Sequence, residues 1–424
     1  MRSFKFLFII LFVLAASSCS KAPPPTVMVV FGATGDLTAR KILPAVETLA
    51  GEGRLPEKFA VVGVARRAKE EFRKQIVFSQ KLYYCQTSFE EEEGYERLAG
   101  LLDQIDRDFG AKSNRIYFLS TQPSYFSPII EQLSKHNLIY KPGEKQWSRV
   151  MIEKPFGHDL ESALALQNEI SQLLDESQIY RIDHYLGKEG VQNLIDFRLK
   201  GELEPIWNKE HIDHVKITLS ENLGVGTRTK LWEETGLLRD VVQNHIMQLF
   251  SLVAMDLGHE KIKVLESTRP IETFVLGQYG PGVINGLPVP GYLQEKDVPA
   301  SSSVETYIDA QLFIDNDRWK GVPFQIHSGK RLAAQLTEIV VTFKSNDVLH
   351  IRIQPNPAIF FENGKQFATN PFPYSEAYQK LIYDCIRGDK SSFVPKEEQF
   401  AAWRILEPAL HAKSQLISYP AGDF

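Results

Sequence analysis

Residues 26–37 read TVMVVFGATGDL, and this stretch decides the fold of the chain. An apolar run rich in β-branched residues ends in glycines and then becomes helix-like, which predicts a buried strand that turns directly into a helix. Similar apolar runs follow at 59–64, 115–119 and 148–152, with helical patterns between them. Strands that alternate with helices in this way predict a parallel, doubly wound sheet.

The turn after the first strand has a composition suited to a phosphate. Gly32 and Gly35 let backbone N–H groups approach a pyrophosphate, and the N-terminus of the following helix adds positive potential. The stretch lacks the full three-glycine fingerprint, so a tight turn without a ligand is the alternative. Its place at the start of a strand–helix–strand pattern favours a dinucleotide.

The end of the second strand indicates which dinucleotide binds. An NAD enzyme usually places Asp or Glu there, whereas Arg accommodates a 2′-phosphate. This strand ends in Ala65, Arg66 and Arg67, and guanidinium pairs well with phosphate. We therefore predict NADP, with Arg66 and Thr34 contacting the 2′-phosphate. The alternative for Arg67 is a plain exposed arginine.

The second half of the sequence changes character. Polar and apolar residues alternate at 214–219, 304–313, 338–343 and 348–353, as expected for half-buried antiparallel strands. We expect a Rossmann-like doubly wound domain followed by an α+β domain with a large, mainly antiparallel sheet. The predicted boundaries are a leader and proline linker at 1–25, a dinucleotide-binding domain at 26–182, and a substrate-binding and dimerisation domain at 183–424.

Residues 181–189, RIDHYLGKE, are poor material for a core. Fully burying an acid, an imidazole, a phenol and an ammonium costs several kcal/mol unless each finds a partner. The same side chains suit a phosphorylated substrate, because His, Tyr and Lys can all donate to phosphate oxygens. We predict a phosphate site here.

Lys154 follows the strand at 148–152, within the string EKPFG. Ligands of open α/β sheets bind beyond the carboxyl ends of the strands, where this lysine would lie. A lysine near a strand end is, on its own, more often a surface residue.

His245 lies in a polar Gln-Asn-His run that opens an apolar-periodic helix. An unperturbed pKa near ~6.5 suits a general base at neutral pH, and the alternative is a hydrogen-bonded core histidine. Asp240 is five residues away and does not face His245 on a regular helix. The carboxylate that orients His245 is therefore expected from elsewhere.

These motifs occur in the order found in the glucose-6-phosphate dehydrogenase family, which the chain resembles from Thr26 to about Tyr419. The resemblance implies oxidation of glucose 6-phosphate to 6-phosphogluconolactone with reduction of NADP, the first step of the oxidative pentose phosphate pathway. It also extends the cofactor loop to Asp36 and Leu37, and gives Lys154 contact with both cofactor and substrate. A homodimer is implied as well.

The resemblance assigns the remaining roles. His245 takes the C1 hydroxyl proton, and Asp183 pairs with His245. The implied sugar contacts are Lys154, Glu221, Asp240 and Lys330, and the implied phosphate contacts are His184, Tyr185 and Lys188. Glu221 and Lys330 would attract no attention without the resemblance.

Some features depart from the family pattern. Gln335 stands where the family usually has a cation, and the chain is short between Pro355 and Tyr374. The trimmed sheet puts the dimer interface in doubt. A second enzyme hypothesis is therefore another sugar-phosphate dehydrogenase, and the non-enzyme hypothesis is an anchored binding module that keeps the fold without turnover.

Composition excludes little. The chain has 424 residues, with 43% hydrophobic and 24% charged, which favours more than one domain. A formal net charge of −5 argues against general nucleic-acid binding. The cysteines at 19, 85 and 385 show neither metal-ligand spacing nor a disulfide framework, and we predict no metal.

The N-terminus resembles a signal peptide. Arg2 and Lys5 precede an apolar run at 6–16, then two serines and Cys19, as in bacterial lipoproteins. The alternative is a mis-chosen start codon, with the protein beginning near Pro25. NADP chemistry favours the cytoplasm, and the alternative location is a bacterial membrane, through a lipid on Cys19.

Overall fold

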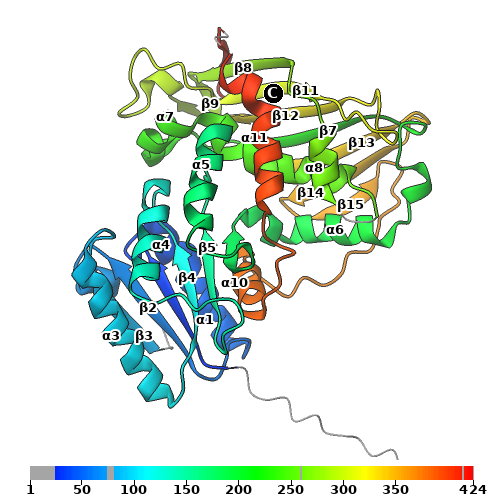
Figure 1. Cartoon of the computed structure of the whole chain (residues 1–424). Helices are drawn as coiled ribbons and strands as arrows, with labels where there is room; N and C mark the ends of the chain where they lie inside the picture. Colours follow the sequence, from blue (N-terminus) through cyan, green and yellow to red (C-terminus); the bar gives the residue numbers. More distant parts are fainter. Residues whose placement is uncertain (1–23, 74–80, 258–259, 413–414, 424) are drawn as a thin grey trace, which may run out of the picture.

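The structure is a computed structural model that describes residues 24–73, 81–257, 260–412 and 415–423. Most of the predicted leader, including Cys19, lies outside the described residues. Two sheets organise the chain, one below the other in Figure 1. Among the described residues, no helix is both long enough and apolar enough to cross a bilayer.

The N-terminal sheet is parallel throughout and has the strand order β3-β2-β1-β4-β5-β6. Its strands are β1 (Thr26–Phe31), β2 (Phe59–Ala65), β3 (Lys81–Gln86), β4 (Asn114–Leu119), β5 (Ser148–Ile152) and β6 (Ile179–Arg181). This is the doubly wound order, in which the first βα turn lies at the point where the strand order reverses. The predicted fold of this half is confirmed.

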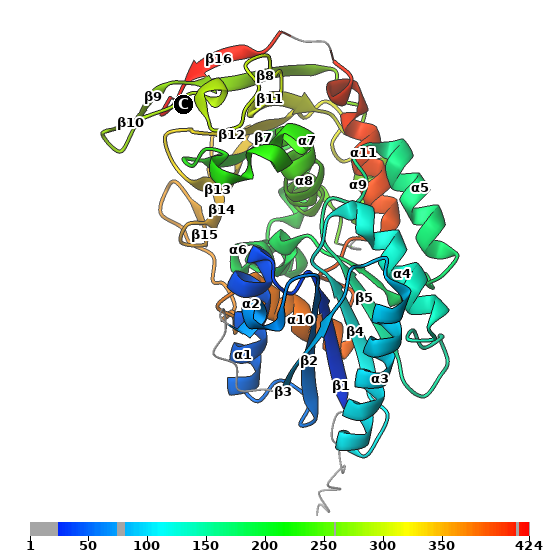
Figure 2. The ribbon, with the colours of Figure 1, turned by 90° about the vertical axis from the view of Figure 1, so that its left-hand side faces the viewer.

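Helices cover both faces of this sheet (Figure 2). They are η1 (Thr38–Ile42), α1 (Leu43–Gly51), α2 (Lys69–Arg73), α3 (Glu92–Phe109), η2 (Pro123–Tyr125), α4 (Phe126–Lys135), α5 (Leu160–Ser171) and η3 (Glu176–Gln178). The first strand is buried on both sides, because Val27 and Val29 pack with α3, α4 and α5 while Met28 and Val30 pack with α1. A continuous apolar run is the pattern that such a strand requires.

The second sheet has eight strands in the order β15-β14-β13-β7-β12-β11-β8-β16. Its strands are β7 (Ile212–Glu221), β8 (Thr273–Gly280), β11 (Tyr307–Leu312), β12 (Phe324–Lys330), β13 (Leu336–Phe343), β14 (Val348–Gln354), β15 (Ala358–Phe361) and β16 (Ile417–Pro420). Only the β7·β12 and β8·β16 pairs are parallel. The sheet is therefore mainly antiparallel, as predicted, and β9 (Gly282–Ile284) and β10 (Leu287–Val289) form a separate hairpin.

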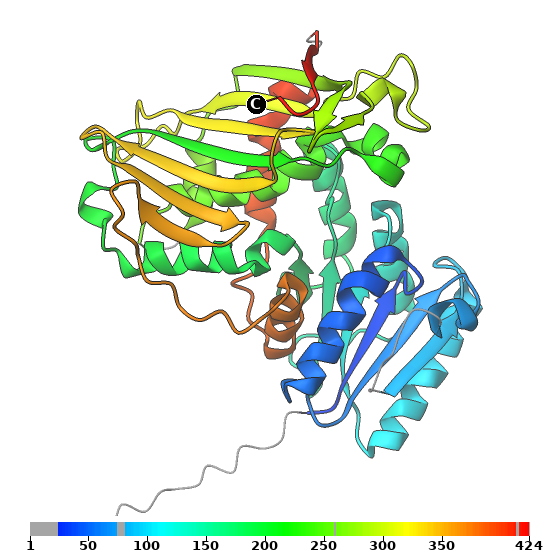
Figure 3. The same cartoon turned by 180° about the vertical axis from the view of Figure 1, so that it is seen from behind.

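Most helices of this half pack on the face of the sheet that turns toward the first domain, and Figure 3 shows the opposite face. They are η4 (His184–Gly187), α6 (Glu189–Lys200), η5 (Glu204–Ile206), η6 (Gly226–Arg228), α7 (Thr229–Leu237), η7 (Leu238–Ile246), α8 (Met247–Ala254), α9 (Lys261–Glu266), η8 (Tyr292–Gln294), α10 (Ala377–Arg387) and α11 (Lys396–Leu410).

Two C-terminal helices reach back to the first domain. Leu381 and Ile382 of α10 lie in the same core as Met28 and Val30 of β1. Trp403 of α11 joins the core on the other face of the parallel sheet, where its Nε1 donates to the Phe156 carbonyl at 3.2 Å. The boundary at residue 182 separates the two sheets, but the two cores are interlocked by these helices.

Candidate active site

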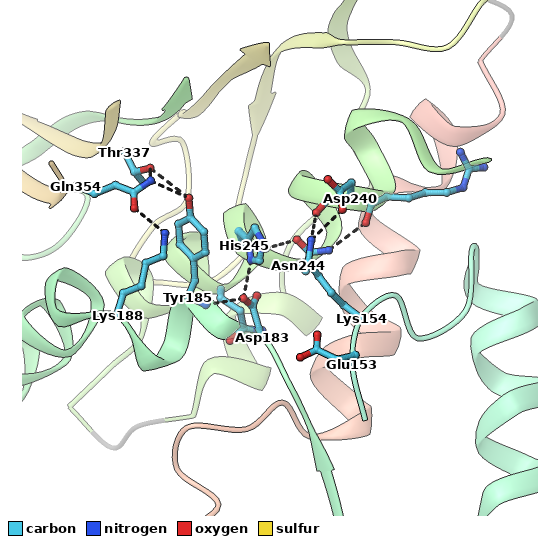
Figure 4. Close-up of polar contacts among 12 residues, drawn as sticks. Glu153, Lys154, Asp183, Tyr185, Lys188, Asp240, Asn244, His245, Thr337 and Gln354 are labelled. Carbon is cyan, nitrogen blue, oxygen red and sulfur yellow. Dashed lines mark hydrogen bonds and ion pairs between the residues drawn. The ribbon is translucent and has the colours of Figure 1, made fainter. Parts of the chain in front are cut away.

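The centre of the site is a histidine–carboxylate pair. Asp183 follows the last strand of the parallel sheet, and His245 lies on η7 of the second domain. Their Oδ1 and Nδ1 atoms are 2.5 Å apart, and Asp183 Oδ1 also accepts the Tyr185 backbone N–H at 3.0 Å (Figure 4). Both side chains are buried. This arrangement holds the imidazole in one tautomer and leaves Nε2 free to exchange a proton.

Burial and charge act on this pair in opposite directions. Burial alone would raise the pKa of Asp183, but the adjacent His245 holds that pKa well below its usual range. Burial lowers the pKa of His245, and the carboxylate of Asp183 partly opposes that effect. The pair therefore keeps an ionised Asp183 beside a neutral imidazole at neutral pH, which is the state that a general base requires.

The helix that carries His245 is not a regular α-helix. Residues 238–246 form a π-helix, whose hydrogen bonds connect residues five apart. The spacing argument for Asp240 and His245 assumed 3.6 residues per turn, which does not hold in this segment. Its conclusion nevertheless agrees with the structure, because the carboxylate that hydrogen-bonds to His245 is that of Asp183. Asp240 is affected mainly by burial and by Lys154, and His245 makes only a minor contribution to its lowered pKa.

Lys154 follows β5 and connects the parallel sheet to the helix that carries His245. Its Nζ donates to the Asp240 carbonyl at 2.5 Å and to Asp240 Oδ1 at 3.0 Å. Burial would raise the pKa of Asp240, but the contact with Lys154 holds it well below its ordinary value. Lys154 is thus a charged, oriented donor rather than a free surface lysine.

Tyr185 and Lys188, two of the three predicted phosphate contacts, lie on the side of His245 away from Lys154 (Figure 4). The Tyr185 ring stacks on the His245 ring at 4.1 Å, and Lys188 Nζ lies 3.7 Å from the centre of the Tyr185 ring. Burial lowers the pKa of Lys188 to about 8. His184 and Lys188 line a cavity of about 460 Å³ together with Lys41 and Tyr378. Burial lowers the pKa of His184 well below its ordinary value, so this ring is a neutral donor. The cations of the cavity are Lys188 and Lys41, and Lys41 is paired with Glu376, which also lines it. This cavity, called the basic cavity below, suits an anionic group through Lys188 and its neutral donors.

Glu221 and Lys330 form a pair at neighbouring strand ends. They lie side by side in the parallel β7·β12 register and make a short ion pair. Lys330 is buried and its Nζ lies 4.7 Å above the Trp232 ring. Glu221 is partly exposed and acts electrostatically on Tyr185 and Lys188. The pair therefore lies near Tyr185 and Lys188, and the Glu221 carboxylate is accessible to a ligand.

The glycine loop forms the cofactor side. Gly32 has a φ of 82°, and a Cβ there would lie 2.1 Å from the Ser120 carbonyl oxygen, so only glycine is tolerated. Gly35, Asp36 and Leu37 line a cavity of about 310 Å³ that also contains Lys154 and Asp240. A backbone-lined cradle at a strand–helix turn fits a dinucleotide pyrophosphate.

The end of β2 lies against this loop. The Gly32 and Ala33 backbone N–H groups donate to the Val64 carbonyl at 3.0 and 3.2 Å. Arg66 and Arg67 follow directly and are exposed, and Thr34 is half-buried in the loop. Arg66 is thus available to a ligand that extends from the glycine loop along the sheet edge.

Several residues around the site were missed by sequence reasoning. Gln354 accepts from Lys188 Nζ at 2.6 Å and donates to Thr337 Oγ1 at 3.2 Å, which anchors the lysine to the ends of β14 and β13. Its position as a polar residue at the end of β14 could have pointed to it, because Glu221 and Lys330 at other strand ends were considered. Gln335 is exposed.

Asp183, His184 and His245 have donor atoms that all lie within 4.8 Å of one another. Histidine and carboxylate donors at such spacing also suit a metal ion such as zinc. Asp183 Oδ1, however, already serves His245 Nδ1 and a backbone N–H, which is the arrangement of an acid–base pair.

Fold and site together define a class of protein. A doubly wound dinucleotide-binding sheet meets a buried histidine–carboxylate pair through a shared lysine, which is the construction of an NAD(P)-dependent dehydrogenase.

Comparison with known proteins gives the particular family. A family model for the NAD binding domain of glucose-6-phosphate dehydrogenase matches residues 29–193, and one for its C-terminal domain matches 197–424. The glucose-6-phosphate 1-dehydrogenase of Chlamydia muridarum is 42% identical, over 93% of this chain and 92% of that protein. The Bacillus subtilis enzyme of the same name is 39% identical, over 91% of each.

Solved structures agree with this result. A glucose-6-phosphate dehydrogenase in complex with its substrate glucose 6-phosphate superposes with a TM-score of 0.84 at 31% identity, over 94% of this chain and 95% of that one. The chain belongs to the glucose-6-phosphate dehydrogenase family and is an oxidoreductase. The resemblance predicted from the sequence is confirmed.

Proposed function

We propose that this chain oxidises glucose 6-phosphate at C1 to 6-phosphogluconolactone with NADP, with His245 as the general base. The observation that carries the proposal is the buried Asp183–His245 pair, at 2.5 Å, between the cofactor cavity and the basic cavity. Family membership supplies the substrate, and the reaction is the first step of the oxidative pentose phosphate pathway.

The proton transfer follows from the tautomer. Nδ1–H of His245 donates to Asp183, so Nε2 carries the lone pair that accepts the C1 hydroxyl proton. Asp183 then stabilises the imidazolium that forms. The nicotinamide ring of the bound cofactor supplies the acceptor for the C1 hydride.

The sugar phosphate is held on both sides of His245. His184, Tyr185 and Lys188 are proposed to receive the phosphate, because two of them line the basic cavity and Tyr185 stacks on the base. Lys154, Asp240, Glu221 and Lys330 are proposed to hold the sugar hydroxyls. Their existing ion pairs supply oriented donors and acceptors.

NADP is proposed over NAD on the basis of the β2 terminus. The glycine loop and β2 are joined by backbone hydrogen bonds, so a ribose bound at the loop lies near Arg66. The guanidinium of arginine binds a phosphate through two hydrogen bonds, whereas an acidic residue at this position would repel the phosphate. Gly32, Thr34, Gly35, Asp36 and Leu37 complete the proposed cofactor contacts.

Assembly and location remain predictions. A homodimer is proposed from the family resemblance, with the face of the eight-stranded sheet seen in Figure 3 as its site. A cytoplasmic location is proposed from the use of NADP. Attachment through Cys19 is the alternative.

A substrate panel tests the proposal. The full-length chain is mixed with NADP and glucose 6-phosphate, glucose, or other hexose phosphates, and NADPH absorbance is followed. Rapid NADPH formation from glucose 6-phosphate alone is expected. A strong preference for another sugar phosphate would support the second enzyme hypothesis, in which exposed Gln335 marks a changed specificity. Absence of turnover by folded, NADP-binding protein would contradict the proposal.

A further inference from the structure

One buried carboxyl at the site has no part in the mechanism above. Glu153 is the first residue after β5 and is only 7% exposed. Its Oε1 lies 2.8 Å from the hydroxyl of Tyr378 on α10, which comes from the other end of the chain. Figure 4 shows the Glu153 side chain near the Asp183–His245 pair.

Tyr378 connects this carboxyl to the basic cavity. It lines that cavity with His184 and Lys188, and its ring lies parallel to the His184 ring, 6.2 Å away. Burial raises the pKa of Tyr378 well above its ordinary value, so the hydroxyl keeps its proton. A phenol carries a single O–H donor. While Glu153 is ionised, that donor is directed to Glu153, and only lone pairs are left for an anion in the cavity.

The charged groups around Glu153 are paired with other residues and do not hold its carboxyl in the ionised form. The ionisable groups that share its small polar cavity are Lys154, Arg181, Asp183 and Glu398. His245 pairs with Asp183, the His184 ring lies parallel to the Tyr378 ring, and Glu376 acts electrostatically on Tyr378 from the residue before α10. The cations have other partners, because Lys154 pairs with Asp240 and Arg181 with Glu176. Glu398 pairs with Lys261.

Burial is the main reason that the pKa of Glu153 rises to about 7, although the Tyr378 hydrogen bond lowers it. Among the described residues Glu153 makes no ion pair. A neutral carboxyl at this position is therefore accessible near neutral pH.

We propose that Glu153 is a positioning residue that takes up a proton when the phosphate of the substrate binds. The proton comes from solvent, and the new carboxyl O–H donates to the Tyr378 oxygen. The O–H of Tyr378 is thereby released to donate to a phosphate oxygen. The inference rests on the proposed function in one respect, namely that the substrate carries a phosphate.

The sign of the pH dependence follows from this linkage. Binding raises the pKa of Glu153, so the complex holds a proton that the free protein loses as pH rises through about 7. Affinity for the phosphate is full below that pH and weakens above it. In the limit that only the protonated form binds, the loss approaches about tenfold per pH unit.

Glu153→Gln is the matched variant. Its amide N–H donates to Tyr378 at every pH, as the protonated carboxyl would. Calorimetric titration with glucose 6-phosphate near pH 7.5, in buffers of different ionisation heat, measures proton uptake without turnover. The substrate phosphate and Lys188 titrate in both proteins, so the difference between them reports Glu153. Wild type is expected to take up more protons than Glu153→Gln.

Steady-state kinetics gives the second readout. The ratio of the wild-type KM to the Glu153→Gln KM should rise about fivefold or more between pH 6.5 and 8.5. Equal proton uptake and a constant KM ratio would overturn the inference. Tyr378→Phe, which has no hydroxyl, is expected to abolish the extra uptake as well, and it serves if Glu153→Gln does not fold.

Failure of the proposed function gives a different result. Loss of turnover with the calorimetric difference intact contradicts the dehydrogenase proposal and leaves this inference supported. Inorganic phosphate is the second probe, because it can bind in the basic cavity without any contact to the sugar-binding residues. Absence of binding by both probes would overturn the inference.

Discussion

At the scale of single residues, the account depends on one imidazole whose two nitrogens have different tasks. Asp183 holds Nδ1, and Tyr185 and His184 pack against the ring at 4.1 and 4.6 Å. Burial without a charged partner would make the imidazolium form of this histidine unfavourable. The adjacent Asp183 carboxylate stabilises the imidazolium that forms during the reaction.

This pairing predicts the titration of His245. Burial lowers its pKa below the usual value of about 6.5, while Asp183 acts to raise it. Histidine-ring NMR of the free protein, with His245 assigned by its absence in His245→Ala, should give a pKa below 6.5. Asp183→Asn should lower it further, since the raising partner is lost. A pKa that is unchanged or higher in Asp183→Asn would refute the described pair.

At the scale of elements, the turn after β2 is expected to decide cofactor choice. Arg66→Ala should raise the KM for NADP about tenfold or more, because a charge-assisted contact contributes about 1.5–3 kcal/mol. The KM for NAD should change little, since NAD has no 2′-phosphate. Arg67→Ala, an equally exposed neighbour, is the matched control. Equal effects of the two variants, or no effect of either, would argue against Arg66 as the phosphate ligand.

Elements with strong periodicity could be predicted from the sequence, and irregular ones could not. The buried run of β1 and the alternation of β13 and β14 follow directly from burial patterns. Edge strand β3, whose residues are mostly half-exposed, lacks such a pattern and was missed. The π-helix at 238–246 was missed because a one-residue shift of backbone hydrogen bonds leaves no mark in side-chain composition.

The site shows the same division. His245 was a candidate base from its residue type, but its pairing with Asp183 was predicted only through the family resemblance, and the structure does bring the two together. Gln354 and Tyr378 lie on elements of the second domain that contact Lys188 and Glu153 across long sequence separations. Residue type alone does not reveal such contacts, because they depend on how the two sheets are docked.

At the scale of the whole molecule, the site exists because the two domains are interlocked. The cofactor loop and Lys154 come from the parallel sheet, while His245 and Asp240 come from a helix on the second sheet. Helices α10 and α11 return from the C-terminal half to pack on the first domain. The position of His245 between the two cavities is therefore a property of the complete chain.

The most direct test of the account is NADPH formation by the full-length chain with saturating glucose 6-phosphate and NADP, beside His245→Ala. Wild type is expected to form NADPH rapidly. The variant should still bind both ligands but turn over about 10²–10⁴-fold more slowly, the usual contribution of a positioned general base. Comparable turnover in a folded His245→Ala protein would contradict the central claim that this histidine removes the C1 hydroxyl proton.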